Sequence, residues 1–214
     1  MARHIDARPA DEIVRVGRLL YERRYVVAAE GNLSVRLEYG RFLITPAGAC
    51  KGQLDAAGLV ELEPADPSVG GESPVPSSEW RVHAEIYARR PDVAAICHAH
   101  PACATAFACA RRELPTALLP EALLVLGDEV PLVPYAAPGS GDLVEALRGR
   151  LPGCAALLLA NHGVVAVGAS LDEAYRRLET VERLAEVALG AERLGGGVRL
   201  TTRQQKVVRE ARRR

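Results

Sequence analysis

The chain has 214 residues, an apolar share of 49%, a charged share of 25% and a formal net charge of zero. These values are typical of one soluble globular domain, and they argue against binding to nucleic acid or membranes through overall charge. The first residues lack the apolar segment of a secretory signal, and no apolar run approaches the roughly 20 residues of a membrane-spanning helix. The five cysteines are odd in number and lack Cys-x-x-Cys spacing, which favours a reducing compartment. We therefore expect a cytoplasmic protein without a nucleic-acid or membrane partner.

The N-terminal part of the chain is predicted to form one helix followed by short strands. Asp11 can cap a helix that runs to about Arg24 with apolar residues at helical spacing. Tyr39-Gly40 and Pro46-Ala47-Gly48 mark turns, and the Pro-, Gly- and Ser-rich stretch 64–76 is expected to be a loop inside the domain. The β-rich runs between these features are residues 25–29, 31–36, 42–45 and 59–62.

The remainder of the chain alternates helices and strands. Ser77-Ser78 is expected to cap a helix to about Arg90, and Ser170 to Glu173 form a capping box for the longest helix, with Gly190 as its C-cap. Residues 195–214 are expected to form a flexible or interface-docking tail. Further expected elements are strands at 94–100, 155–160 and 164–167, helices at 102–111 and 141–151, and extended or mixed regions at 118–126 and 130–134. The pattern predicts a single α/β domain over residues 1–214, with β-hairpins and helices around a sheet.

The most informative short stretch is Cys97-His98-Ala99-His100. If this run is a strand, His98 and His100 point to the same side, roughly 7 Å apart at their roots. Two imidazoles at that spacing can hold one divalent metal, but such a pair is equally compatible with histidines that bind no metal. Cys97 should face away from the metal and pack in the core. A third ligand has to come from elsewhere in the chain.

Five motifs occur in order along the chain, and together they indicate a family. They are Gly31-Asn32-Leu33-Ser34, Thr45-Pro46-Ala47-Gly48, Ser77-Ser78-Glu79, His98-x-His100 and Asn161-His162-Gly163. With these motifs the chain resembles the class II, metal-dependent aldolase/adducin-head family, over nearly its whole length. The resemblance implies a three-layer fold, in which helices flank both sides of a mostly antiparallel central sheet.

The resemblance implies that His98, His100 and His162 are zinc ligands, with one Zn²⁺ per subunit. Glu79 would be a further ligand in the resting enzyme and a catalytic proton shuttle during turnover. Three neutral imidazoles leave zinc its full charge and an open position, as in a catalytic site, although Mn²⁺ or Co²⁺ would also suit imidazole ligands. Without the family, His162 is a turn residue and Glu79 a carboxylate at a helix N-terminus. His83 is expected to be structural.

Phosphate binding is the second expectation from the resemblance. The residues that it implies lie in turns and at a helix start, where backbone N–H groups and hydroxyls can hold a dianion. They are Gly31, Asn32, Ala47, Gly48, Ser77 and Ser78. Without the family, the glycines are ordinary turn residues and Ser77 is a helix cap. Fuculose-phosphate aldolases often have Thr at the position of Ala47, so this chain lacks one hydroxyl donor.

Glu121 is the candidate for a second catalytic acid–base group. In fuculose-phosphate aldolases a tyrosine from a neighbouring subunit protonates the nascent alkoxide, and that position falls on Glu121 here. A carboxylic acid can transfer the same proton if burial raises its pKa. A glutamate at this place is also a feature of the family's methylthioribulose-1-phosphate dehydratases. The alternative is a surface glutamate after Pro120.

From these features we expect a metal-dependent aldolase that cleaves a ketose 1-phosphate such as fuculose 1-phosphate. Retro-aldol cleavage through a zinc-stabilised enediolate would release dihydroxyacetone phosphate and an aldehyde. The alternatives on the same zinc site are dehydration of methylthioribulose 1-phosphate, 4-epimerisation of a ribulose phosphate and decarboxylation of a 3-keto acid phosphate. A non-enzymatic adducin-like module is disfavoured because all four predicted ligands are present. The family also implies a homotetramer with active sites between subunits.

Overall fold

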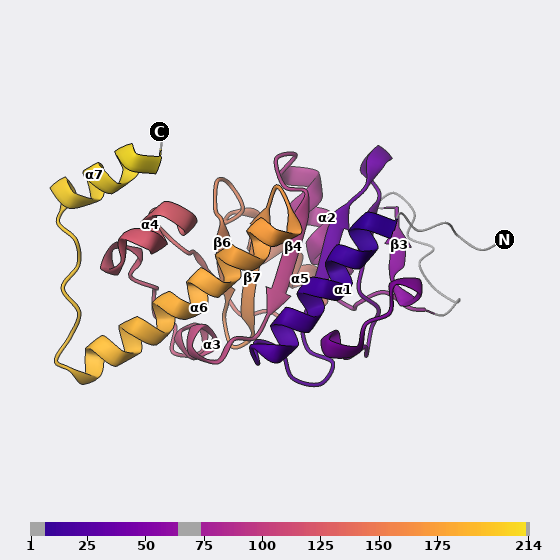
Figure 1. Cartoon of the computed structure of the whole chain (residues 1–214), viewed down its shortest axis with the longest axis horizontal. Coiled ribbons are helices and arrows are strands. Elements are labelled where there is room, and N and C mark those ends of the chain that lie inside the picture. Colours follow the sequence, from indigo (N-terminus) through magenta and orange to yellow (C-terminus); the bar gives the residue numbers. More distant parts are fainter. Residues whose placement is uncertain (1–6, 64–73, 213–214) are drawn as a thin grey trace.

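The computed structural model describes residues 7–63 and 74–212. At its centre lies a seven-stranded sheet in the order β3-β2-β1-β4-β7-β6-β5 (Figure 1). All neighbouring strands are antiparallel except β5 and β6, which are parallel. The strands are β1 (Asn32–Arg36), β2 (Phe42–Ile44), β3 (Val60–Leu62), β4 (Ala95–Ala99), β5 (Leu132–Val133), β6 (Ala156–Leu159) and β7 (Gly163–Gly168).

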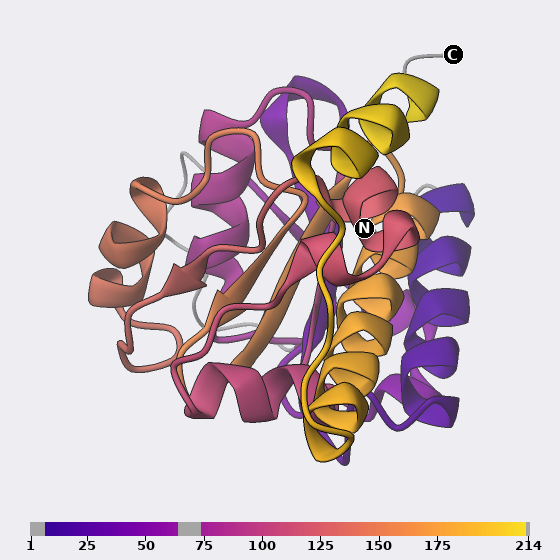
Figure 2. The same cartoon turned by 90° about the vertical axis from the view of Figure 1, so that its left-hand side faces the viewer.

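Helices cover both faces of the sheet, so the expected single-domain, three-layer, mostly antiparallel fold is confirmed. Helices α1 and α6 lie on one face, and α2 and α5 lie on the other (Figure 2). The α-helices are α1 (Ala7–Glu22), α2 (Trp80–Arg89), α3 (Ala102–Cys109), α4 (Pro120–Leu126), α5 (Gly141–Arg148), α6 (Leu171–Arg193) and α7 (Thr202–Arg212). Short 3₁₀ turns occur at η1 (Glu38–Gly40), η2 (Lys51–Gln53), η3 (Ala56–Gly58) and η4 (Thr116–Leu118).

The central strands are apolar on both faces because both faces are covered. In β4, Ala95 and Cys97 belong to the core under α6, whereas Ile96 belongs to the core under α2 and α5. The Cys97 side chain therefore packs in the core, as expected. Small residues on the α6 side of the central strands allow that long helix to lie close to the sheet.

Residues 25–29 form a turn and not the predicted strand. Arg24 and Ala28 have φ angles of 57° and 51°, which a regular strand does not contain. The two sides of β4 are already paired with β1 and β7, so the sheet offers this segment no place there. Instead, the carbonyl of Tyr25 accepts a hydrogen bond of 2.8 Å from the His100 amide. The turn thus helps to hold the chain directly after β4.

Other differences concern helix boundaries. Residues 120–126, expected to be extended or mixed, form α4 with Pro120 in its first turn, where proline is favourable. This apolar run is too short for its periodicity to separate helix from strand. Helix α6 continues to Arg193, so Gly190 is not its C-cap. Helix α1 begins before Asp11, and the N-cap of α2 is Glu79 instead of Ser77 or Ser78.

The described part of the C-terminal tail packs on the same chain. The Leu200 amide donates to the carbonyl of Ala117 at 2.8 Å, and Arg209 forms an ion pair of 2.7 Å with Asp128. These contacts place α7 beside α4, at the left of Figure 1. No helix in the described ranges is long and apolar enough to span a membrane.

Candidate metal centre and active site

Three histidines converge at one end of the β4–β7 pair. His98 lies in β4, His100 follows the strand, and His162 lies in the turn between β6 and β7. Their ring centroids are 4.8 to 4.9 Å apart. One ligand nitrogen from each ring lies within 4.8 Å of the other two. The structure thus brings together the three predicted metal ligands, which we call the histidine triad.

The donor set of the triad fits a divalent metal. Nδ1 of His98 donates to the Val164 carbonyl at 2.9 Å, which directs Nε2 toward the other two rings. The Nε2 atoms of His98 and His100 are 3.2 Å apart. Two nitrogens bound to a tetrahedral zinc, each about 2.0–2.1 Å from it, would lie about 3.3 Å apart. An ion of this kind matches the spacing that the two side chains already have.

The Glu79 carboxylate faces the triad. The side chain is buried, and its Oε2 lies 3.0 Å from His98 Nε2 while its Oε1 lies 3.6 Å from His162 Nε2. Asn32 Nδ2 donates to Glu79 Oε2 at 2.9 Å. The carboxylate makes no capping hydrogen bond to α2, so the alternative role at the helix N-terminus is not the one that its geometry serves. The carboxylate is placed to bind a metal or to move a proton beside it.

The charges of the site suit metal binding. Burial alone would raise the pKa of Glu79, but His98, with smaller effects of His162 and Asn32, holds it well below its usual range. Burial lowers the pKa of His100 to about 3 and that of His162 to about 4, and the neighbouring His98 lowers both further. Two of the imidazoles are therefore neutral and the carboxylate is ionised, which are the forms that ligate a metal.

Glu30, which the sequence analysis missed, lies on the outer side of the triad. Its Oε2 is 3.6 Å from Nδ1 of His100, the nitrogen that faces away from His98. A carboxylate behind a ligating histidine fixes the ring orientation and increases its basicity. No motif includes Glu30; its position directly before Gly31-Asn32 is the available signal.

The Gly31-Asn32 turn approaches the triad closely. Gly31 has a φ angle of +68°, and a Cβ there would lie 2.5 Å from the His98 carbonyl oxygen. Only glycine fits such a position. Because β1 pairs with β4, the Cα of Asn32 is the direct partner of His98. This arrangement carries the Asn32 amide to the edge of the metal centre.

The second and third predicted phosphate-binding segments lie side by side. The Ala47 amide donates to the Val75 carbonyl at 2.9 Å, and the Ser77 amide donates to the Thr45 carbonyl at 3.1 Å. Gly48 has a φ angle of +70°, as its turn requires. The segments that contain Ala47-Gly48 and Ser77-Ser78 are therefore neighbours. Their role in phosphate binding stays a prediction.

Lys51 is the second functional candidate that the sequence analysis missed. It is 1% exposed, and its Nζ donates to the carbonyls of Ala29 and Ala49 at 3.0 and 2.6 Å. Within the described ranges it forms no ion pair, and burial lowers the pKa of this lysine to about 8. One of the chain's two lysines thus ties the segment before Gly31 to the segment after Gly48.

Glu121 lies away from these groups in the single chain. It occupies the first turn of α4 and is exposed. No hydrogen bond or ion pair within the described ranges connects it to the triad. The predicted role was contributed across a subunit boundary, so that role stays a prediction.

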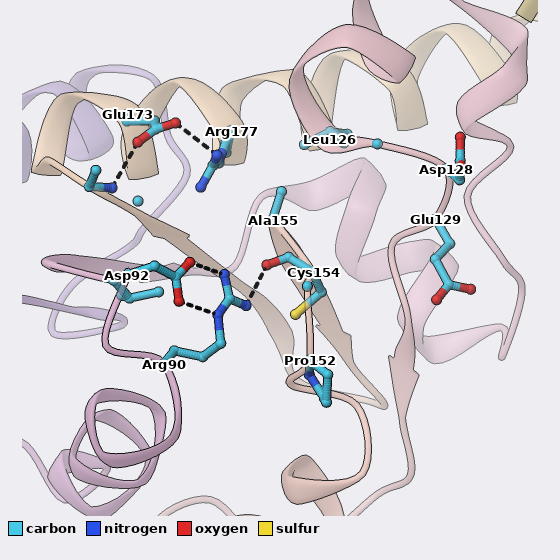
Figure 3. A pocket seen from close by; sticks show the side chains of 15 residues that line it. Arg90, Asp92, Leu126, Asp128, Glu129, Pro152, Cys154, Ala155, Glu173 and Arg177 are labelled. Carbon is cyan, nitrogen blue, oxygen red and sulfur yellow. Dashed lines mark hydrogen bonds and ion pairs between the residues drawn. The ribbon is translucent and has the colours of Figure 1, made fainter. Parts of the chain in front are cut away.

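A second cavity lies at the opposite end of the β4–β7 pair, with a volume of about 630 Å³ (Figure 3). Its cationic side chains are satisfied by neighbours. Arg90 is paired with Asp92 and donates to the Cys154 carbonyl, and Arg177 is paired with Glu173. None of the three histidines lines it. Its size alone therefore does not mark it as the active site.

Comparison with known proteins agrees with the triad. The family described as "Class II Aldolase and Adducin N-terminal domain" matches residues 11–189. A 3-oxo-tetronate 4-phosphate decarboxylase of Haemophilus influenzae is 36% identical over 179 residues, which cover 82% of this chain and 84% of that protein. An L-fuculose phosphate aldolase of Methanococcus vannielii is 32% identical over 176 residues, covering 82% of this chain and 93% of that protein.

The fold agrees as well. The solved structure of an L-fuculose 1-phosphate aldolase matches with a TM-score of 0.87 and 31% identity, covering 98% of both chains. The family match spans the histidine triad, Glu79 and every predicted phosphate-binding residue. The chain therefore belongs to the class II aldolase and adducin N-terminal domain family, and it is a metal-dependent lyase.

Proposed function

We propose that this chain decarboxylates a phosphorylated sugar acid that carries a 3-oxo group, such as a 3-oxo-tetronate 4-phosphate. The observation that carries this proposal is the number of acid–base groups at the triad. Within the described ranges, Glu79 is the one carboxylate that contacts the inner nitrogens, whereas Glu30 contacts the outer Nδ1 of His100. Loss of CO2 requires one proton donor and no base. The similarity to a 3-oxo-tetronate 4-phosphate decarboxylase supports the same reaction.

The proposed reaction balances with groups that this chain supplies. The C1–C2 bond of the 3-oxo acid breaks, its electron pair forms an enolate with the C3 oxygen, and CO2 leaves. One proton then adds to C2. For a four-carbon acid with a 2-hydroxyl and a 4-phosphate, the organic product is dihydroxyacetone phosphate.

His98, His100 and His162 would hold the divalent cation, for which we propose Zn²⁺, with Mn²⁺ or Co²⁺ as alternatives for the same ligands. When bound, such an ion supplies a Lewis acid that stabilises negative charge on the substrate oxygen. Glu79 would carry the proton to C2. The substrate carboxylate would lie close to it, and two like charges at short distance raise the pKa of one of them, which favours the protonated form.

The phosphate would lie against the turns near the triad. Their backbone N–H groups and the serine hydroxyls provide donors for a dianion. The proposed residues are Gly31, Asn32, Ala47, Gly48, Ser77 and Ser78. Lys51 adds a buried positive charge between two of these segments, which offsets the hydroxyl that Ala47 does not provide.

Retro-aldol cleavage of a ketose 1-phosphate is the second candidate, favoured by the fold match to an L-fuculose 1-phosphate aldolase. It leads to the same enediolate and the same product, but an aldehyde leaves instead of CO2, and the C4 hydroxyl must lose a proton. In a homotetramer, Glu121 of a neighbouring copy would be the acid–base group for that step. Dehydration and epimerisation are alternatives from the sequence that no single contact here favours. A cytoplasmic location remains our expectation.

Product analysis tests these proposals. The zinc-loaded protein is incubated with 3-oxo-tetronate 4-phosphate and, separately, with fuculose 1-phosphate, while dihydroxyacetone phosphate, CO2 and aldehyde are measured. The proposal predicts CO2 and dihydroxyacetone phosphate from the keto acid. Aldehyde and dihydroxyacetone phosphate from fuculose 1-phosphate alone would favour the aldolase, and turnover of neither would contradict both.

A further inference from the structure

A stripe of α2 faces two residues of β1 beside the triad. Glu79, His83 and Tyr87 recur every four residues and so share one side of the helix. Asn32 and Ser34 are two residues apart in β1 and so point to the same side of the strand. All five side chains are buried. The two sets of polar groups therefore meet in the core, where each needs a partner.

These side chains form one continuous line of hydrogen bonds, which alternates between helix and strand. The Tyr87 hydroxyl lies 2.7 Å from Ser34 Oγ, which lies 2.6 Å from His83 Nδ1. His83 Nε2 lies 2.5 Å from Asn32 Oδ1. Asn32 Nδ2 lies 2.9 Å from Glu79 Oε2. The line therefore runs without a gap from Tyr87 to the carboxylate that faces the triad.

The direction of every bond follows from the carboxylate. Glu79 can only accept, so Asn32 presents its NH₂ group to Glu79 and its oxygen to His83. That oxygen needs a donor, so His83 carries its proton on Nε2. Burial lowers the pKa of His83 to about 3, and the nearby His98 lowers it further. The ring is therefore neutral, and its Nδ1 accepts the hydroxyl proton of Ser34.

Ser34 in turn accepts from Tyr87, so all four bonds point toward Glu79. The tyrosine keeps its proton, because burial raises the pKa of Tyr87 above its ordinary value. Reversing any single bond would place two acceptors or two donors against each other. A fully satisfied buried network of this kind permits one arrangement and resists reorientation.

We propose that Tyr87, Ser34, His83 and Asn32 orient the Glu79 carboxylate toward the histidine triad, with His83 as a neutral Nε2–H tautomer. His83 is then a positioning residue and does not ligate the metal, since both of its ring nitrogens are used. If His83 did not donate, the Asn32 amide could rotate and turn its oxygen toward Glu79. The functional importance of this orientation rests on the proposed function, in which Glu79 moves the proton.

The tautomer can be measured on the unmodified protein. ¹⁵N-labelled full-length chain is studied by NMR at pH 7, metal-free and zinc-loaded, and the His83 signals are assigned by their loss in His83→Gln. The proposal predicts a neutral ring protonated on Nε2 in both states. A ring protonated on Nδ1, or on both nitrogens, would overturn it. This result does not depend on any substrate, so it stands apart from the test of the proposed function.

Enzyme variants test the positioning role. His83→Gln keeps an N–H donor for Asn32, whereas His83→Leu removes both polar contacts. Loss of such an outer partner typically costs roughly 10- to 100-fold. We therefore expect this decrease in kcat for His83→Leu, with KM and zinc stoichiometry nearly unchanged, and substantial recovery in His83→Gln. Equal losses in both variants, or no loss in either, would contradict positioning.

Tyr87→Phe provides a milder variant in case His83→Leu does not fold. It removes only the first donor of the line and keeps the ring that packs on Phe42, with centroids 5.3 Å apart. We expect a shift of the His83 Nδ1 resonance and a decrease in kcat of a few fold. Tyr175→Phe is the matched control, because that hydroxyl donates to Glu179 on α6, and it should change neither quantity. An unchanged His83 resonance in Tyr87→Phe would contradict the line of hydrogen bonds.

Discussion

The two ends of the β4–β7 pair differ in how their charged groups are satisfied. At the end that carries His98, buried polar side chains converge on one point, and the Nδ1 of His162 has no hydrogen-bond partner within the described ranges. At the opposite end, the charged groups around the larger cavity pair with one another, as Arg90 does with Asp92 (Figure 3). Converging groups that still lack partners, and not cavity size, distinguish the reactive end.

The largest effect should follow from breaking the triad. His98→Ala removes the central ligand, and we expect loss of the bound metal and at least about a thousandfold loss of lyase activity, because a bound metal supplies several kcal/mol of charge stabilisation. Metal content by atomic emission and product formation measure both. A variant that is active without metal would contradict the assignment.

At the opposite end, Arg90→Met should affect stability and not chemistry. The guanidinium donates to the carbonyls of Leu151 and Cys154 at 2.8 and 2.9 Å, and the variant leaves both without this donor. We expect a decrease of about 1–3 kcal/mol in the free energy of unfolding, measured in urea, with unchanged kcat of the folded enzyme. A decrease in kcat comparable to that of a triad variant would erase the distinction between the two ends.

Lys51→Met tests the one buried charge near the triad that has no ionic partner. We expect KM for the phosphorylated substrate to rise about tenfold, equivalent to about 1.4 kcal/mol, with a smaller change in kcat. The unfolding free energy should stay equal or increase, because a buried uncompensated charge is costly. An unchanged KM would show that Lys51 takes no part in phosphate binding.

The pH dependence of stability checks the same lysine. Its pKa is about 8 in the folded chain, below the ordinary value of 10.5. Between about pH 8 and 10 the unfolded chain therefore retains a proton that the folded chain has lost, so this group makes stability rise with pH. Urea unfolding over this range should show a smaller rise in Lys51→Met. Identical profiles would contradict the low pKa.

The smallest effect should come from Asp92→Asn, the matched change within the second cavity. The Asp92 side chain is 64% exposed, and exposed ion pairs contribute about 0–1 kcal/mol. We expect a change in unfolding free energy at the lower end of that range and unchanged kinetics. If this variant impaired turnover, the second cavity would be part of the catalytic machinery.

The sequence alone indicates the parts of the site that depend on local spacing. His98 and His100 share a strand face because strands alternate, and the resemblance adds Glu79 and His162. The fold class was predictable for the same reason, since its longer elements have clear periodicity. Short apolar segments such as residues 120–126 were not predictable, because seven residues fit a helix and a strand equally well.

Long-range contacts account for the other omissions. Lys51 is important because the carbonyls of Ala29 and Ala49 meet around its Nζ, and no local pattern reports that meeting. The position of His83 likewise depends on the register of α2 against β1, although the spacing of Glu79, His83 and Tyr87 is visible in the sequence. Side chains that act across elements require the fold.

Reversible metal dependence tests the central claim most directly. The purified chain is treated with a chelator, assayed for dihydroxyacetone phosphate release from 3-oxo-tetronate 4-phosphate and from fuculose 1-phosphate, and then titrated with Zn²⁺. The account predicts that activity disappears on chelation and returns with one equivalent of metal per chain. Full activity in the metal-free chain would contradict it.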